Sequence, residues 1–168
     1  MKEVLVALGI VVILAIGLAP PAFAAQEVGI TCTVTPQSVS VTVNTTSIAY
    51  GVVDVSQTSS EIVATNNGNA AENFNIKGAN ATGSGGDTTW TLSTAVGANQ
   101  YMHEFAKPTY PTAGTHTNWT SLTTTYQPLA ASIAPSGTQL FKLQIWTPSS
   151  TTGYGQCSTT VTIQAVAA

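Results

Sequence analysis

The sequence predicts an all-β protein: an antiparallel β-sandwich of the Ig-like or jelly-roll kind, with eight to ten short strands behind an N-terminal signal peptide. Two observations lead to this fold class. Apolar residues recur at every second position in many short segments, and this period is typical of half-buried strands because successive side chains point to opposite faces. Beyond the N-terminal apolar run, no stretch of 10 or more residues has helical spacing. A barrel is the alternative all-β architecture.

Residues 1–24 form the predicted signal peptide. Lys2 gives a short basic start, an uncharged apolar run covers residues 4–19, and Ala-Phe-Ala at residues 22–24 provides the small-x-small pattern of a cleavage site. Cleavage there would leave a single domain over residues 25–168, a length that suits one hydrophobic core. The alternative is retention as an uncleaved anchor, since the apolar stretch is long enough to reach across a bilayer.

Strand-like segments follow one another through the first three quarters of this domain. They cover residues 28–34, 38–43, 48–53, 61–65, 72–77, 89–94, 100–106, 119–126 and 129–133. In the first segment, Val28, Ile30, Cys32 and Val34 share one face. Asn-Asn-Gly-Asn at residues 66–69 predicts a tight turn, because Asn and Gly tolerate positive φ.

The C-terminal strands show the clearest alternation of apolar and polar residues. Residues 139–146 place Phe141, Leu143 and Ile145 on one face, and residues 156–166 alternate in the same way. The segment between them is rich in Ser, Thr, Pro and Gly, which are typical of loops. We therefore expect the two strands to form a hairpin.

Charge is scarce, which excludes several classes of partner. Only 7% of residues are Asp, Glu, Lys or Arg, against about 25% in ordinary globular proteins. Arg is absent, and residues 25–168 contain three Lys: Lys77, Lys107 and Lys142. Nucleic acids and anionic membranes are bound through clusters of basic side chains. The sequence therefore predicts no nucleic-acid partner, and membrane contact only through an uncleaved N-terminal segment.

Two cysteines remain, Cys32 and Cys157. Each lies on the apolar face of its predicted strand, in a chain destined for an oxidising compartment. We expect a disulfide that joins the first and last strands. The alternative is two separate buried thiols, and a metal site would need further ligands.

No catalytic, metal or cofactor site is predicted. The acidic residues show no paired spacing, and the two histidines lack the neighbours of a catalytic arrangement. His103 alternates with Tyr101 and Phe105, so we expect a strand histidine that is buried or half-buried, while His116 is expected in a solvent-facing loop.

Two kinds of surface site are candidates. Tyr110 and Trp119 flank the irregular stretch at residues 107–118, and an exposed aromatic ring can stack on the apolar face of a sugar; Trp119 as a core residue is the alternative. Three Asn-x-Ser/Thr triplets offer candidate glycosylation sites at Asn44, Asn80 and Asn118.

Residues 48–75 resemble a pattern of strand, Asn-Gly turn and strand that recurs in Ig-like surface and filament proteins. The segments that carry it are Ala-Tyr-Gly-Val-Val at residues 49–53, Ile-Val-Ala-Thr-Asn-Asn-Gly-Asn at residues 62–69 and Glu-Asn-Phe at residues 72–74. The chain is similar in this respect to camelysin-like biofilm-fibre proteins and archaeal bundling-pilus subunits. Thr-Trp-Thr-Leu at residues 89–92 resembles the first motif of WxL wall-binding domains, whose second motif is missing here.

These observations predict a non-enzymatic structural protein, secreted or held at the cell surface. We expect it to self-associate into a filament, pilus or sheath through edge-strand contacts. The resemblance implies that a freed segment joins a neighbour's sheet, with residues 25–30 or the tail at 165–168 as donor. The alternative is a secreted adhesin or carbohydrate-binding module with surface glycans as partners.

Overall fold

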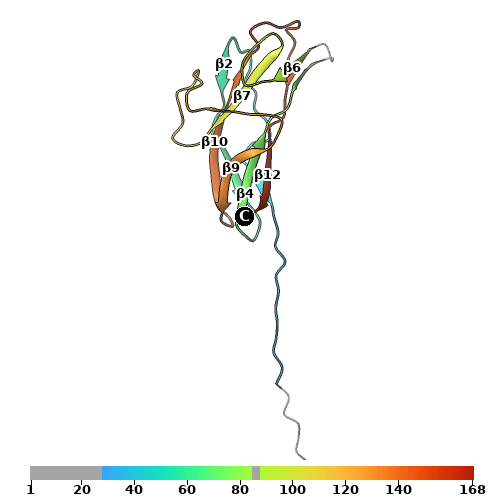
Figure 1. Ribbon diagram of the computed structural model, residues 1–168, viewed down its shortest axis with the longest axis vertical. Helices are drawn as coiled ribbons and strands as arrows, with labels where there is room; N and C mark the ends of the chain where they lie inside the picture. Colours follow the sequence, from blue (N-terminus) through green and yellow to red (C-terminus); the bar gives the residue numbers. More distant parts are fainter. Residues whose placement is uncertain (1–27, 85–87) are drawn as a thin grey trace, which may run out of the picture. The chain divides into compact units, whose positions relative to one another are not determined.

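The computed structural model describes residues 28–84 and 88–168, and every regular element in them is a β-strand (Figure 1). The chain divides into two units, Met1–Thr35 and Pro36–Ala168. We call the second unit the body and residues 28–35 of the first unit the arm. All strands lie in the body. The predicted signal peptide, residues 1–24, lies outside the described residues. Among those described, no helix could cross a bilayer.

A nine-stranded sheet forms the larger part of the body. Its main path runs β1-β3-β10-β7-β6-β5-β11, while β2 pairs with β10 and β8 pairs with β7. The strands are β1 (Val41–Val43), β2 (Ser56–Thr58), β3 (Ile62–Asn66), β5 (Ala81–Gly83), β6 (Thr89–Leu92), β7 (Gln100–Ala106), β8 (Thr120–Ser121), β10 (Thr138–Trp146) and β11 (Cys157–Ser158). Because β6 and β7 are parallel, the sheet is mixed and not purely antiparallel as expected.

A second sheet has three antiparallel strands in the order β12-β4-β9. These are β4 (Glu72–Lys77), β9 (Gln127–Ile133) and β12 (Thr162–Ala167). The alternation predicted for β4 is confirmed, since Phe74 and Ile76 are fully buried. The C-terminal tail is paired within the body, because β12 lies along β4 and the Ala168 amide donates to the Ala71 carbonyl (3.2 Å).

The hydrophobic core takes side chains from both sheets. Its buried cluster consists of Ile62, Ala64, Phe74, Ile76, Phe105, Leu122, Leu129, Phe141 and Leu143. Val161, Ile163 and Ala165 from the last part of the chain pack against this cluster while remaining partly exposed. The all-β prediction is therefore confirmed, and the apolar faces assigned to β10 and β12 do face the core.

The predicted C-terminal hairpin is wrong. β10 has β3 and β2 along one edge and β7 along the other, so neither edge is free for another long strand. β12 crosses to the other sheet and pairs with β4. The turn at residues 66–69 likewise connects one sheet to the other, from β3 to β4.

Two predicted strands are missing. Residues 28–34 form no strand and are exposed throughout. Residues 48–53 are also irregular; Gly51 has a positive φ of 74°, which breaks the extended run, and Val52 is fully exposed. Both segments alternate in sequence yet have no ladder partner among the described residues.

Candidate functional site

An apolar groove opens into the core between the end strands of the two sheets. It has a volume of about 570 Å³. One wall is β1 with residues 45–50, and the other is residues 156–161 with β12. Its apolar lining consists of Val43, Ile48, Ile62, Phe141, Leu143, Ile145, Val161 and Ile163. Phe141 and Leu143 belong to the buried core cluster, so the floor of this groove is the core itself.

The walls of the groove carry unpaired backbone. β1 and β12 are each the end strand of their sheet. Along residues 46–53 and 159–161, no hydrogen bond to another backbone group forms within the described part of the chain. Buried or edge-facing backbone amides and carbonyls favour a partner, and an added strand is the usual one. The groove therefore has the length, edges and apolar floor that an additional β-strand requires.

A buried histidine lies among the apolar side chains at the floor of this groove. His103 on β7 lines the groove and is 3% exposed; its Nε2 atom lies 3.1 Å from the Tyr50 hydroxyl. The His103 Nδ1 atom has no hydrogen-bond partner within the described residues. Burial lowers the pKa of His103 to about 4, so the ring is neutral near pH 7. The same burial raises the pKa of Tyr50. The groove is thus uncharged when it is open.

The arm has the complementary pattern. Val28, Ile30 and Val34 are 82%, 87% and 91% exposed, and Cys32 on the same face is exposed too. Gly29, Thr31 and Thr33 occupy the alternate positions. Aliphatic side chains exposed at every second position of an extended segment are typical of a strand without its sheet.

The chain enters the body at a hydrogen-bonded corner. The Asn69 side chain accepts from the Ser38 amide (2.8 Å) and donates to the Pro36 carbonyl (2.9 Å). The buried Glu72 carboxylate accepts from the Ser40 amide (2.8 Å). A Cβ atom on Gly68 would overlap Glu72 and the Ser38 carbonyl. Residues 36–40 are therefore held at the end of the body where β12 and the C-terminus also finish (Figure 1).

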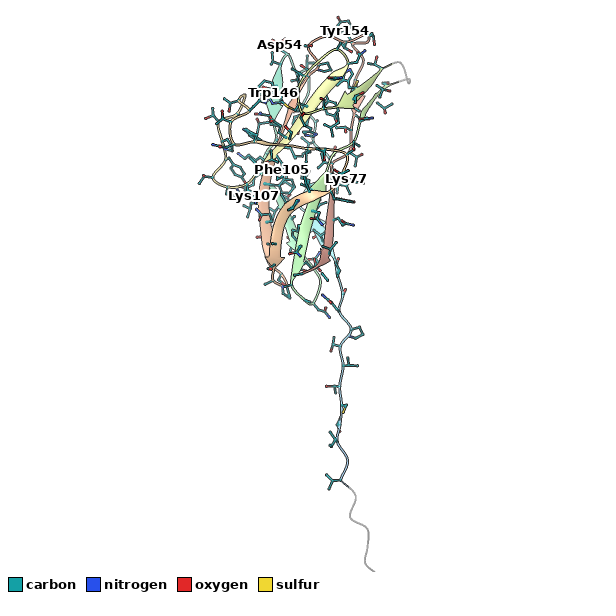
Figure 2. All side chains as sticks on the ribbon, viewed as in Figure 1. Asp54, Lys77, Phe105, Lys107, Trp146 and Tyr154 are labelled. Atoms are coloured by element: carbon teal, nitrogen blue, oxygen red, sulfur yellow. The ribbon has the colours of Figure 1, made fainter. Side chains whose placement is uncertain are left out.

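The groove runs away from that corner. On one wall, Val41 is opposite Asn66 near the corner, and the lining continues from Val43 to Tyr50. On the other wall, Ala167 is opposite Glu72, and the lining continues from Ile163 back to Gln156. The opposite end of the body carries the loops of Asp54 and Tyr154 (Figure 2).

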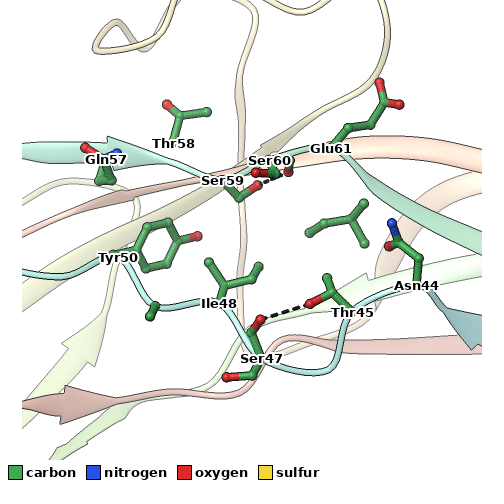
Figure 3. A pocket seen from close by; sticks show the side chains of 12 residues that line it. Asn44, Thr45, Ser47, Ile48, Tyr50, Gln57, Thr58, Ser59, Ser60 and Glu61 are labelled. Atoms are coloured by element: carbon green, nitrogen blue, oxygen red, sulfur yellow. Dashed lines mark hydrogen bonds between the residues drawn. The ribbon is translucent and has the colours of Figure 1, made fainter.

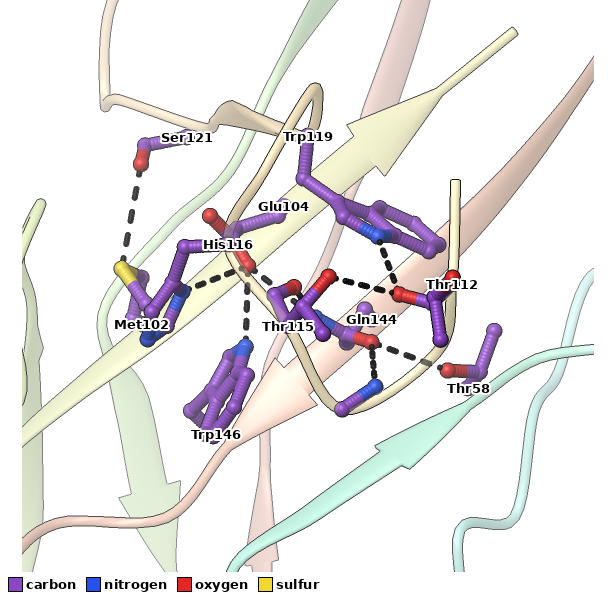
Figure 4. Close-up of polar contacts among 11 residues, drawn as sticks. Thr58, Met102, Glu104, Thr112, Thr115, His116, Trp119, Ser121, Gln144 and Trp146 are labelled. Atoms are coloured by element: carbon purple, nitrogen blue, oxygen red, sulfur yellow. Dashed lines mark hydrogen bonds and ion pairs between the residues drawn. The ribbon is translucent and has the colours of Figure 1, made fainter. Parts of the chain in front are cut away.

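The reverse faces of β7 and β10 are closed by a polar network (Figure 4). Glu104 is 2% exposed, and its Oε2 atom accepts from Trp146 Nε1 (2.8 Å) and Gln144 Nε2 (3.2 Å). His116 Nδ1 lies 3.2 Å from the same oxygen, and the His116 ring stacks on Trp146 at 4.1 Å. The loop at residues 107–119 thus covers this face and is fastened to it from within the same chain.

A second, polar hollow lies beside the groove (Figure 3). It has a volume of about 450 Å³ and shares the segment at residues 45–50 with the groove. Hydroxyl and amide groups dominate its lining, with Asn44, Gln57, Ser59 and Glu61 among them. The described residues contain no group of three or more His, Cys, Asp or Glu side chains that could hold a metal ion.

The structure places the two cysteines in different surroundings. Both thiols are free, so the predicted Cys32–Cys157 disulfide does not form within this chain. Cys32 lies on the exposed arm, which is not the inward-facing first strand that was expected. Cys157 is half-buried on β11 and lines the groove.

The two aromatic residues proposed as glycan contacts have partners inside the body. Trp119 is 8% exposed, and its Nε1 atom donates to the Thr112 carbonyl (3.2 Å), so its ring packs in the core. The Tyr110 hydroxyl donates to Glu61 (2.7 Å), and the Lys142 amine lies 4.6 Å from the centre of the Tyr110 ring. Glycan contact at these residues stays a prediction.

The three candidate glycosylation residues are exposed. The Asn44 side chain accepts from the Val63 amide (2.9 Å), and the Asn80 side chain accepts from the Leu92 amide (3.0 Å). Asn118 has a φ of 63° in the loop before β8. Their modification stays a prediction.

Sequence reasoning missed the groove and the Glu104 network. The network joins residues 12 and 42 positions apart, and no local spacing marks such a meeting. One sequence signal does bear on the arm and the groove wall: residues 28–34 and 48–53 alternate like strands, although neither segment has a place in the sheets of the body.

No protein-family model, curated protein or solved structure matches this chain.

Proposed function

We propose that this protein is an exported, non-enzymatic subunit of an extracellular filament, in which the arm of one copy fills the groove of the next. The body in this proposal is an Ig-like or jelly-roll sandwich that lacks one strand. The observation that carries the proposal is that one chain has both an open apolar groove and an exposed apolar arm. Cleavage after Ala24 would leave three residues, 25–27, between the new N-terminus and Val28.

The dimensions and chemistry of arm and groove agree. At about 3.4 Å per residue, the seven positions from 28 to 34 span about 24 Å, comparable to the six residues of β12 with part of the preceding wall. Val28, Ile30 and Val34 would contribute about 1.5–3 kcal/mol each on full burial. An added strand would also satisfy the free edge of β12, in the manner of β-strand addition.

The positions of the corner and the groove favour an open assembly. The chain leaves the body at the corner of residues 36–40, and the groove occupies a different surface. Donor and acceptor surfaces are therefore not the same, which makes the contact heterologous. Heterologous contacts that do not close into a ring produce filaments. Low charge suits this role, because few like charges would repel between copies.

Electron microscopy of the purified chain beginning at residue 25 tests the proposal. We expect filaments from the wild type and from Thr31→Lys, whose side chain is on the opposite face of the arm from Ile30. Ile30→Lys should abolish them, because the lysine would have to enter the apolar groove. Dispersed monomers from the wild type, or equal behaviour of the two variants, would contradict the proposal.

A matched pair in the groove tests the acceptor side. Ile48 lines the groove, whereas Val52 lies in the same irregular segment and is fully exposed. Ile48→Lys should prevent assembly and Val52→Lys should permit it. Circular dichroism of each variant establishes that the body is folded, so that loss of filaments can be assigned to the groove.

A second candidate function is glycan binding at the polar hollow of Figure 3. The observation that favours it is the concentration of hydroxyl and amide groups around an open hollow next to Glu61 and Tyr110. An adhesin of this kind would bind on a glycan array, and Ser59→Val with Glu61→Gln should remove that binding. A silent array would remove this candidate and leave the filament proposal in place.

A further inference from the structure

The two free thiols occupy the two partners of the proposed contact. Cys32 lies on the arm, on the same face as Val28, Ile30 and Val34. Cys157 lines the groove. It lies at the end of its wall that is most distant in sequence from the C-terminus. Each cysteine is thus on the surface that the other copy would meet, and the chain contains no third cysteine.

We propose that Cys32 of one copy forms a disulfide with Cys157 of the next, so that each arm is covalently linked to the neighbouring subunit. This inference rests on the filament function proposed above. It names the residues that lock the contact between copies.

The entry direction of the arm places the two cysteines together. Cys32 is four positions before Pro36, where the body begins, so on an inserted arm it lies close to the donor's body. Two docking directions are available along the groove. If the donor's body sits at the loop end of the acceptor, Cys32 falls at the Cys157 end of the groove. This direction joins the corner end of one copy to the loop end of the next, as a linear filament requires.

A disulfide within one chain is opposed by chain length. Ala167 is paired at the corner, the six residues of β12 span about 20 Å from there, and four further residues separate β12 from Cys157. The four-residue link from Cys32 to Pro36 reaches only about 14 Å, while Asn69 holds Pro36 at the corner. A bridged pair needs its Cα atoms within about 7 Å. The same-chain bond would therefore require the corner hydrogen bonds to break.

The bond can form by thiol–disulfide exchange with a small-molecule disulfide, such as oxidised glutathione. The exposed Cys32 thiolate attacks the oxidant and releases one thiolate, leaving a mixed disulfide on the arm. After insertion, the Cys157 thiolate attacks the Cys32 sulfur and releases the second thiolate. The two cysteine protons end on the two released thiols, and the oxidant gains the two electrons that the cysteines lose. Burial raises the pKa of Cys157, which favours Cys32 as the first nucleophile.

Isotope mixing tests the inference on the full chain that begins at residue 25. Equal amounts of unlabelled and ¹⁵N-labelled subunits are mixed while reduced and unassembled, then assembled with oxidised glutathione and analysed by peptide mass spectrometry. We expect the Cys32 and Cys157 peptides to be joined, with mixed-isotope pairs in the proportion of random pairing. Same-isotope pairs alone, Cys32–Cys32 pairs, or filaments without this bond would overturn the inference.

Serine variants separate this inference from the filament function. Cys32→Ser mixed with Cys157→Ser should give linked pairs on a non-reducing gel, while the wild type gives a ladder that collapses with reductant. The double variant should still form filaments under the microscope, but they should dissociate in detergent. If the double variant forms none while the linked wild type does, the bond drives assembly and the groove contact does not. If neither forms filaments, the function itself fails.

Discussion

The two faces of the β7–β10 pair differ in what covers them. On one face, the loop at residues 107–119 is hydrogen-bonded to Glu104 and Gln144, and its His116 ring packs on Trp146. On the other face, His103, Phe141 and Leu143 form the floor of a groove that the described chain leaves open. The polar face is completed from within the chain, and the apolar face is left for a strand from outside.

This difference has a physical basis. A buried carboxylate is costly unless its partners are always present, so a partner supplied by the same chain is the safe arrangement. An apolar groove costs less when it is empty, because no buried charge is left unpaired. The groove histidine, His103, is neutral near pH 7 because burial lowers its pKa to about 4. An intermolecular contact is therefore better placed on the apolar face.

Breaking the closed face should have the largest effect. Glu104→Ala removes the common acceptor of Trp146, Gln144 and His116. Trp146 Nε1 then has no acceptor, and Gln144 Nε2 keeps only the Thr115 carbonyl. We expect a loss of about 3–5 kcal/mol in the free energy of unfolding. Urea unfolding followed by tryptophan fluorescence measures it. Glu61→Ala, at an exposed carboxylate, is the control and should cost less than about 1 kcal/mol.

Acid should lower the free energy of unfolding of the body, because it protonates His103 in the groove. The unfolded chain protonates His103 near pH 6.5, whereas the folded chain does so only near pH 4. The stability attached to neutral His103 is complete above pH 6.5 and is lost as pH falls to 4, by about 3 kcal/mol in all. Unfolding curves across this range, compared with His103→Gln, isolate the contribution of this ring. Identical pH profiles for the two proteins would contradict its burial as a neutral group.

A change in the arm should affect assembly and leave the body unchanged. Ile30→Ala removes most of one aliphatic side chain from the proposed contact, worth about 2 kcal/mol, which corresponds to about a 30-fold rise in the critical concentration. Sedimentation of filaments measures that concentration. Thr31→Ala on the other face of the arm is the control. A fall in the body's urea midpoint for Ile30→Ala would mean that the arm packs on its own body.

The smallest effect is expected at the rim of the closed face. The His116 side chain is 52% exposed, so its interaction with Glu104 is partly screened by water. His116→Ala should cost less than about 1 kcal/mol in urea unfolding and should leave the Trp146 bond to Glu104 in place. A loss as large as that of Glu104→Ala would show that the loop, and not the buried bonds, closes this face.

The sequence anticipated much of the body. Alternation located β4, β7 and β10 correctly, since each of these strands places apolar side chains of one face in the core. The same pattern predicted strands at residues 28–34 and 48–53, which the structure does not form. Alternation reports which side chains require a sheet. It contains no information on which chain provides the sheet.

Pairing was harder to predict than strand position. The loop before Cys157 favoured a hairpin, yet the occupied edges of β10 direct the last strand to β4, and those edges depend on contacts distant in sequence. The same limit applies to the site. Cys32 and Cys157 were expected to pair within one chain because both lie on apolar faces, and nothing in the sequence places one on the arm and the other in the groove.

Hydrogen exchange on the assembled full chain tests the central claim most directly. If the arm of one copy fills the groove of the next, the amides of residues 28–34 and the free-edge amides of β12 should become protected together when filaments form. Protection should disappear from both segments in Ile30→Lys, which keeps the body folded. Filaments in which residues 28–34 exchange as fast as an unstructured peptide would contradict the account.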